Sequence, residues 1–183
     1  VPSEKAERAN AAHVMVDKDI QRYAEEHNEP WIAKKLRGLS LPDGEPVDVM
    51  VPGQDGKVAH GLEVKTMVKN GNMKLTMDKY AQVRKVDWEQ RQKAKFHTVV
   101  MDDHAVFNAN GDGVHDVSKR VYYYRRGCAG SARVATMHKC KDLAEVKRLM
   151  EMPEAELPDA AKRTDGKLMV GKWKPLPEKE GRG

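Results

Sequence analysis

Two carboxylates and one lysine fall in two neighbouring segments that show the polar–apolar alternation of β-strands. Asp48 lies in the segment 46–51, and Glu63 and Lys65 lie in the segment 61–68. Carboxylates that face each other repel, so a fold that pairs them needs a compensating positive charge. A divalent cation such as Mg²⁺ supplies that charge, because it prefers carboxylate and carbonyl oxygens as ligands. The residues therefore predict a metal site suited to phosphodiester hydrolysis.

The turn between the two segments decides which residues face each other. Asp55-Gly56 is a favoured pair for a two-residue type I′ turn, in which both positions need a positive φ. With that turn, Asp48 falls directly opposite Glu63, and Lys65 lies on the same face, diagonal to Asp48. The other face is expected to carry a set of apolar side chains: Val47, Val49, Val51, Leu62 and Val64.

The same pattern also has a purely structural interpretation. Exposed sheet faces often carry Glu and Lys at alternate positions, so a Glu-x-Lys triplet alone is weak evidence for a catalytic site. The opposed Asp48 and the apolar second face strengthen the catalytic interpretation, but these features alone leave both interpretations open.

The elements around the hairpin predict an α/β domain with a mixed sheet. Asp17 is expected to cap a helix that reaches His27, and Asn28 to cap a second, short helix that ends at Gly38. The further expected elements are a helix over 77–94 capped by Thr76, a buried strand over 96–101, strands over 120–125 and 131–137, and a helix over 142–152.

Composition divides the chain into an arm, a domain and a tail. Its 183 residues suffice for one ordinary domain, expected over 17–152, with 1–16 as an N-terminal arm or linker. Residues 153–183, rich in Pro, Lys, Glu and Gly, are expected to form an extended, partly disordered tail. Because the first residue is Val rather than Met, we expect a processed chain or part of a longer protein.

Charge and hydropathy narrow the class of partner. A net charge of +5 and a pI of about 9.1 favour a polyanion, and DNA is the expected one. No apolar run approaches the roughly 20 residues that cross a bilayer, so no membrane partner is expected. Cys128 and Cys140 fit no zinc or redox spacing, which favours reduced thiols in the cytoplasm. Homo-oligomer formation is left open.

Pro46-Val-Asp48 followed by Glu63-Val-Lys65 on the next strand resembles the PD-(D/E)XK nuclease superfamily. The resemblance implies a restriction-endonuclease-like core, a central mixed β-sheet flanked by helices, and an endonuclease-type hydrolase that cleaves DNA. It further implies Mg²⁺ or Mn²⁺ held by Asp48, Glu63 and the carbonyl of Val64, with Lys65 catalytic. Pro46 departs from the family pattern, because it lies two residues before Asp48 rather than next to it.

The resemblance covers roughly residues 17–103 and implies two further contributions. The family often adds a glutamate from the first helix, and Glu29 is favoured here over Glu26 and Glu25. It also often uses a polar residue on the helix after the Glu-x-Lys strand. The candidates are Lys79, Gln82, Arg84 and Lys85, and the three basic ones are also part of a cationic helix that could hold phosphates. Arg125 and Arg126 are expected to extend this nucleic-acid-binding surface, although solvated charges would look the same.

Segments 23–33, 62–66, 97–100 and 122–127 together resemble the C-terminal region of tailed-phage head-morphogenesis (minor capsid) proteins. This resemblance implies phage head proteins as partners, in the host cytoplasm or the virion. It also supports the main alternative to a nuclease, a non-catalytic structural or DNA-binding domain. A metal-free ribonuclease that uses His60 and His97 as acid and base is a further alternative.

Overall fold

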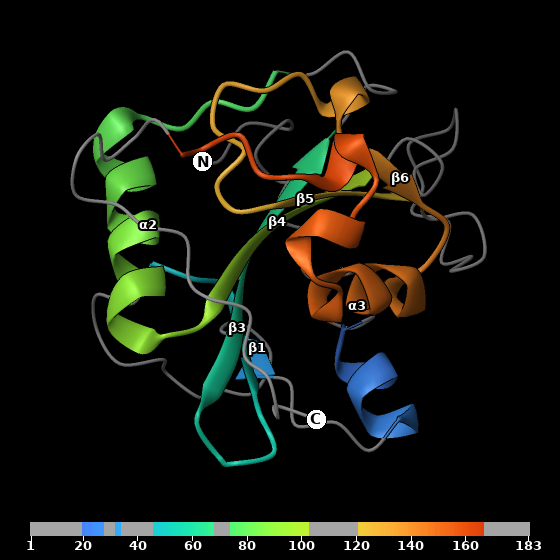
Figure 1. Cartoon of the computed structure of the whole chain (residues 1–183). Coiled ribbons are helices and arrows are strands. Elements are labelled where there is room, and N and C mark those ends of the chain that lie inside the picture. Colours follow the sequence, from blue (N-terminus) through green and yellow to red (C-terminus); the bar gives the residue numbers. More distant parts are fainter. Residues whose placement is uncertain (1–19, 28–31, 34–45, 68–73, 103–120, 167–183) are drawn as a thin grey trace, which may run out of the picture.

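The computed structural model describes residues 20–27, 32–33, 46–67, 74–102 and 121–166 (Figure 1). The strands are β1 (Ile32–Ala33), β2 (Val49–Pro52), β3 (Val58–Met67), β4 (Lys95–Asp102), β5 (Val121–Arg126) and β6 (His138–Cys140). The helices are α2 (Lys79–Gln92), α3 (Leu143–Glu151) and the short 3₁₀ turns η2 (Val134–Thr136), η3 (Glu154–Glu156) and η4 (Asp159–Ala161). Residues 20–26 are also helical, as predicted.

Within the described residues, six strands form one mixed sheet in which spatial order follows chain order from β1 to β6. Neighbouring strands are antiparallel except β3 and β4, which are parallel. A parallel pair needs a long crossover connection, and α2 lies in it. The predicted α/β class with a mixed sheet is therefore confirmed.

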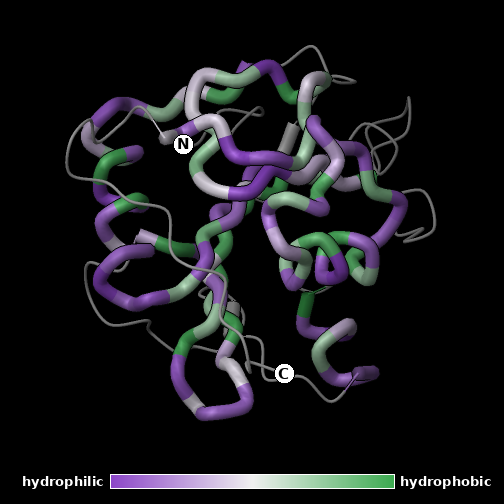
Figure 2. Tube along the Cα trace, in the orientation of Figure 1, coloured by the Kyte–Doolittle hydropathy of each residue, from purple (hydrophilic) through white to green (hydrophobic). Residues whose placement is uncertain are grey.

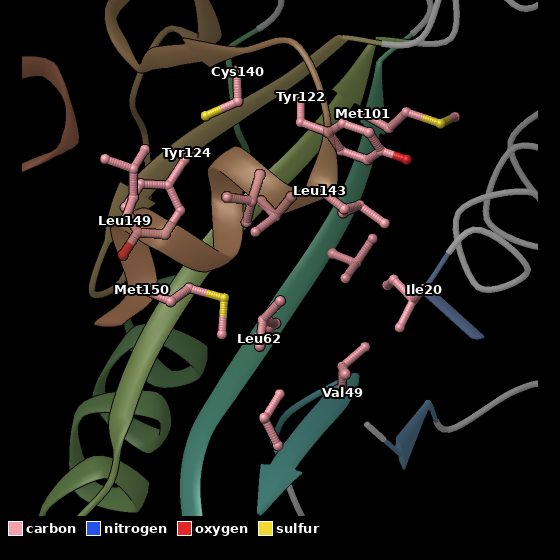
Figure 3. Packing of buried hydrophobic residues seen from close by; sticks show 14 of the residues in the cluster. Ile20, Val49, Leu62, Met101, Tyr122, Tyr124, Cys140, Leu143, Leu149 and Met150 are labelled. Atoms are coloured by element: carbon pink, nitrogen blue, oxygen red, sulfur yellow. The ribbon is translucent and has the colours of Figure 1, made fainter. Parts of the chain in front are cut away.

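The helices α2 and α3 lie on opposite faces of this sheet (Figure 1). On the α3 face, Leu62 and Val64 of β3 pack against Val146 and Leu149 of α3 in the largest apolar cluster (Figure 3). On the α2 face, the Trp88 ring lies so close to Gly61 that a Cβ there would be 2.4 Å from it. Most of α2 is hydrophilic (Figure 2), so Trp88 is its main apolar anchor on the sheet.

The sequence predicted the positions of α2 and α3 to within two residues, but it predicted the wrong N-cap residue for α2. The Asp142 side chain caps α3 by accepting from the backbone N–H of Glu145 at 2.9 Å. Asp78, rather than Thr76, caps α2, since its side chain accepts from the N–H of Ala81 at 2.7 Å. A carboxylate at this position is a strong N-cap, so the helix begins slightly later than predicted.

Two predicted elements are wrong. The short helix expected from Asn28 is contradicted at Ile32–Ala33, which form β1 and pair with β2, while its other residues lie outside the described ones. The strand expected over 131–137 is replaced by η2, because Ser131 has a positive φ of 62° and the chain turns there. The next strand, β6, begins only at His138.

The structured region continues past the boundary expected at residue 152. Leu157 and Ala161 lie in the core beneath α3, where an extended tail had been expected. Arg163 binds both carboxylate oxygens of Glu89 on α2, at 2.7 and 2.9 Å. Residues 153–166 are therefore part of the domain, and the predicted 1–16 arm and the tail beyond 166 lie outside the described residues.

Candidate functional site

The register between β2 and β3 places Asp48 beside Glu63, as the sequence predicted. Val49 pairs with Leu62, so in the next pair of the antiparallel ladder Asp48, the residue just before β2, comes opposite Glu63. The predicted turn is nevertheless wrong: Gly56 has a positive φ of 77° and Asp55 does not, which excludes type I′.

Two differences from the predicted hairpin cancel each other. Gly53 donates to the carbonyl of Lys57 at 2.6 Å, which shifts the turn by one residue. Pro52 pairs with Val58 but Val51 with His60, so a bulge adds one residue to β3. The bulge restores the predicted register at the far end of the hairpin.

Asp48 lies in a bend directly before β2 and is fixed by two hydrogen bonds. Its N–H donates to the Leu62 carbonyl at 2.8 Å, and its Oδ2 accepts from the N–H of Val64 at 2.8 Å. The carboxylate thus takes the place of a backbone acceptor. The bend also breaks the alternation, so Val47 packs with Trp88 on the α2 side and not, as predicted, with Val49.

Glu63 is more deeply buried than Asp48, with 9% of its surface exposed. Burial and then the neighbouring charge of Asp48 raise the pKa of Glu63 to about 7, although Lys85 and Lys65 act to lower it. Its two oxygens each meet one lysine: Oε1 lies 3.2 Å from Nζ of Lys65, and Oε2 lies 3.7 Å from Nζ of Lys85. The site therefore combines two carboxylates with two ammonium groups.

Lys85 was one of four candidates on the helix after the Glu-x-Lys strand, and it is the one that the structure places beside Glu63. It is 7% exposed, and its Nζ donates to the Pro46 carbonyl at 3.2 Å. Its spacing was a usable signal: Lys85 lies three residues before Trp88, and residues three apart share a helix face. A helix face that carries Trp88 inward carries Lys85 inward too.

The other candidates on α2 divide between surface and interior. Lys79 and Arg84 are exposed, and the Arg84 guanidinium lies 5.9 Å from the ring centre of exposed Tyr80. The Gln82 amide instead donates to the Met77 carbonyl at 2.7 Å and packs on Gly130, where a Cβ would be 2.3 Å away. Gln82 is therefore an internal contact.

Arg125 and Arg126 do not form the predicted phosphate-binding edge. Arg126 is 2% exposed, and its Nη2 donates to the carbonyls of Leu149 and Met150 at the end of α3. Arg125 is also buried and donates to the Thr136 carbonyl at 3.0 Å. Both guanidinium groups bind backbone carbonyls of neighbouring elements. The sequence pattern could not distinguish such internal arginines from arginines on the surface.

Among the described residues, the remaining predicted glutamates add no further side chain to the site. Glu29 lies outside the described residues, and Glu25 and Glu26 are exposed. Glu25 accepts from Gln21 at 3.1 Å on its own helix. The Val64 side chain is buried on the α3 face, and its carbonyl as a metal ligand stays a prediction.

The histidine pair lies on β3 and β4. Nδ1 of His60 is 2.9 Å from Nε2 of His97, and Nδ1 of His97 is 2.6 Å from the Tyr124 hydroxyl. Burial lowers the pKa of His97 well below its usual value. A neutral, fully buried ring that bridges two partners is a poor general acid, so this geometry does not favour the metal-free ribonuclease.

No protein-family model, curated protein or solved structure matches this chain. Among the described residues, no helix is both long enough and apolar enough to cross a membrane.

Proposed function

We propose that this protein is a metal-dependent nuclease that hydrolyses phosphodiester bonds in DNA, on a restriction-endonuclease-like fold. The observation that carries the proposal is the meeting of Asp48 and Glu63 beside Lys65 and Lys85. The parallel strand pair, with α2 between β3 and β4, supports this choice of fold.

The donor set fits a hard divalent cation. Asp48 and Glu63 offer oxygens on one face of the hairpin, and burial followed by the charge of Asp48 raises the pKa of Glu63 although two lysines act to lower it. We propose that these carboxylates, with the Val64 carbonyl, hold Mg²⁺ or Mn²⁺. Such an ion would supply Lewis-acid stabilisation of the phosphate and a lowered pKa for the attacking water.

The two lysines have different surroundings and therefore different proposed roles. The Lys65 side chain is 37% exposed, so its ammonium can reach a bound phosphate and stabilise the charge of the transition state. Lys85 is buried and tied to the Pro46 carbonyl, which suits a positioning residue that orients Glu63. Exposed Lys79 and Arg84 are proposed to contact the DNA backbone.

One observation favours a second candidate. Two ammonium groups already balance two carboxylates, so the cluster could be a structural ion-pair network without a metal. The protein would then be a non-catalytic domain that binds DNA, associated with phage head proteins in the virion or the host cytoplasm. This candidate predicts DNA binding without cleavage.

The test is nicking of supercoiled plasmid by the full chain with Mg²⁺ or Mn²⁺, with and without EDTA. The nuclease proposal predicts nicking that EDTA abolishes and that Glu63→Gln loses. Glu151→Gln, an exposed position at the end of α3, is the matched control and should retain activity. Metal-independent binding without nicking would support the structural candidate. Cleavage of RNA under the same conditions would instead identify a ribonuclease.

A further inference from the structure

Three side chains with metal-binding atoms meet at the edge of the sheet formed by β6. His138 and Cys140 are two residues apart on this strand, so they point to the same face. Glu145 belongs to the first turn of α3, which follows β6 directly. The imidazole nitrogen, the thiol sulfur and a carboxylate oxygen all lie within 4.8 Å of one another.

The three residues are held in place by the local fold. The Asp142 cap fixes the first turn of α3, and Glu145 Oε2 accepts from the N–H of Lys141 at 3.1 Å. Glu145 Oε1 remains 3.7 Å from Nε2 of His138 and 3.9 Å from the Arg148 guanidinium. One carboxylate oxygen thus faces the imidazole.

The three side chains differ in burial, and the difference leaves a metal ion a route from solvent to the buried thiol. Cys140 is fully buried in the core, whereas the His138 and Glu145 side chains are about one quarter exposed, at 26% and 23%. An ion could therefore arrive from the imidazole and carboxylate side and meet the thiol at the bottom.

We propose that His138, Cys140 and Glu145 form a zinc-binding site that fastens β6 to α3. Imidazole, thiolate and carboxylate are the groups that bind Zn²⁺, and three protein ligands leave the fourth tetrahedral position to water. Binding breaks the S–H bond of Cys140, forms a sulfur–zinc bond and releases one proton to solvent. The thiolate and carboxylate charges then balance the 2+ charge of the ion, with His138 neutral.

The site is separate from the nuclease site. Cys140 belongs to the cluster on the α3 face, whereas Glu63 lies on the opposite, α2 face of the sheet. A metal at β6 is therefore expected to stabilise the domain, because it binds the folded state and not the separated ligands.

Co²⁺ is the probe, since it replaces zinc and shows a sulfur-to-metal charge-transfer band when a thiolate is bound. The reduced full chain is titrated anaerobically in a phosphine reductant. The band is expected in wild type, in Glu63→Gln and in Cys128→Ala, which removes the other buried thiol. Cys140→Ala should lose the band, and Zn²⁺ should displace it from wild type. An absent band in wild type, or an equal band in Cys140→Ala, would overturn the proposal.

A second measurement covers the case in which Cys140→Ala does not fold. His138→Gln and Glu145→Gln change partly exposed side chains, so the core should tolerate them. Zn²⁺ should raise the Tm of wild type by several degrees and leave the Tm of both variants nearly unchanged. Lys139→Ala, an exposed position between the two ligands, is the control and should respond like wild type. An equal rise in Tm in all proteins would rule out this site.

Discussion

Nζ of Lys85 on α2 lies 3.7 Å from Oε2 of Glu63 on β3 and so joins the crossover helix to the strand that carries the candidate site. The same Nζ donates to the Pro46 carbonyl, just before Asp48. Lys85 therefore contacts Glu63 and the backbone two residues before Asp48, and its removal would alter the position of Glu63 as well as the charge around it.

Lys65→Ala is expected to retain metal binding and to lose about 10²–10⁴-fold in cleavage rate, the usual range for a group that acts in proton transfer or charge stabilisation. Lys65 faces the phosphate in the proposed site and does not ligate the ion. Mn²⁺ calorimetry and single-turnover cleavage measure the two effects separately. Lys57→Ala in the hairpin turn is the exposed control. Lost Mn²⁺ affinity in Lys65→Ala would contradict this division of roles.

Glu63 should make the metal-free protein less stable as pH rises. Its pKa is about 7 in the folded protein, whereas the reference pKa of a glutamate is 4.5. Between these two pH values the folded state therefore binds one proton more than the unfolded state. The contribution of Glu63 to the free energy of unfolding decreases as pH rises from about 4.5 to 7. Above pH 7 the total decrease is at most about 3 kcal/mol.

Glu63→Gln removes that titration while its amide oxygen can still accept from Lys85. In EDTA at pH 8 the variant should melt at a higher temperature than wild type, and the difference should vanish near pH 4. Thermal melts across this range measure it, with Glu151→Gln as the control. A lower Tm for Glu63→Gln at pH 8 would show that the ion pairs with the lysines dominate, as the structural candidate requires.

DNA binding should depend strongly on salt and little on sequence. Lys79 and Arg84 are exposed on α2, and each phosphate contact adds about −0.9 to the slope of log K against log salt. Their double replacement by Ala should flatten the slope by up to about two units in fluorescence anisotropy. Lys139 and Lys141, exposed beside β6, form the matched double control. An unchanged slope would make the α2 surface an ordinary solvated face.

Arg163→Ala should destabilise the domain by about 3–5 kcal/mol, because it removes the guanidinium whose Nη2 contacts both oxygens of the buried Glu89 carboxylate. Urea unfolding measures the loss. Arg91→Ala breaks an exposed pair with Asp87 on the same helix and should cost at most about 1 kcal/mol. Equal, small effects would show that the segment after η4 does not contribute to the fold.

The sequence predicted those features of the fold that are determined by residues close together in the chain. The alternation around Asp48 and Glu63, the periodicity of α2 and the apolar run of β4 were recognisable in the sequence, and the fold keeps the last two. The alternation holds in β2 and β3, but the bend at Asp48 breaks it and places Val47 on the α2 side. The β2–β3 register was also predicted, although through the wrong turn, because the bulge before His60 offsets the shifted turn.

Contacts between distant segments could not be predicted in this way. Arg163 and Glu89 are 74 positions apart, and nothing near either residue indicates that they meet. Arg126 looked like surface charge because its partners are backbone carbonyls, which carry no sequence signal. Lys85 was only partly recognisable, since its inward direction follows from Trp88 but its contact with Glu63 depends on how α2 lies on the sheet.

The proposed nuclease activity requires one divalent ion between the Asp48 and Glu63 carboxylates. Anomalous scattering from crystals soaked in Mn²⁺ measures this directly, and a Glu63→Gln crystal treated in the same way is the control. We predict an anomalous peak within bonding distance of both carboxylates in wild type and its loss in the variant. A wild-type crystal in which Glu63 is still paired with Lys65 and Lys85, and in which no peak lies between the Asp48 and Glu63 carboxylates, would contradict the metal-dependent mechanism.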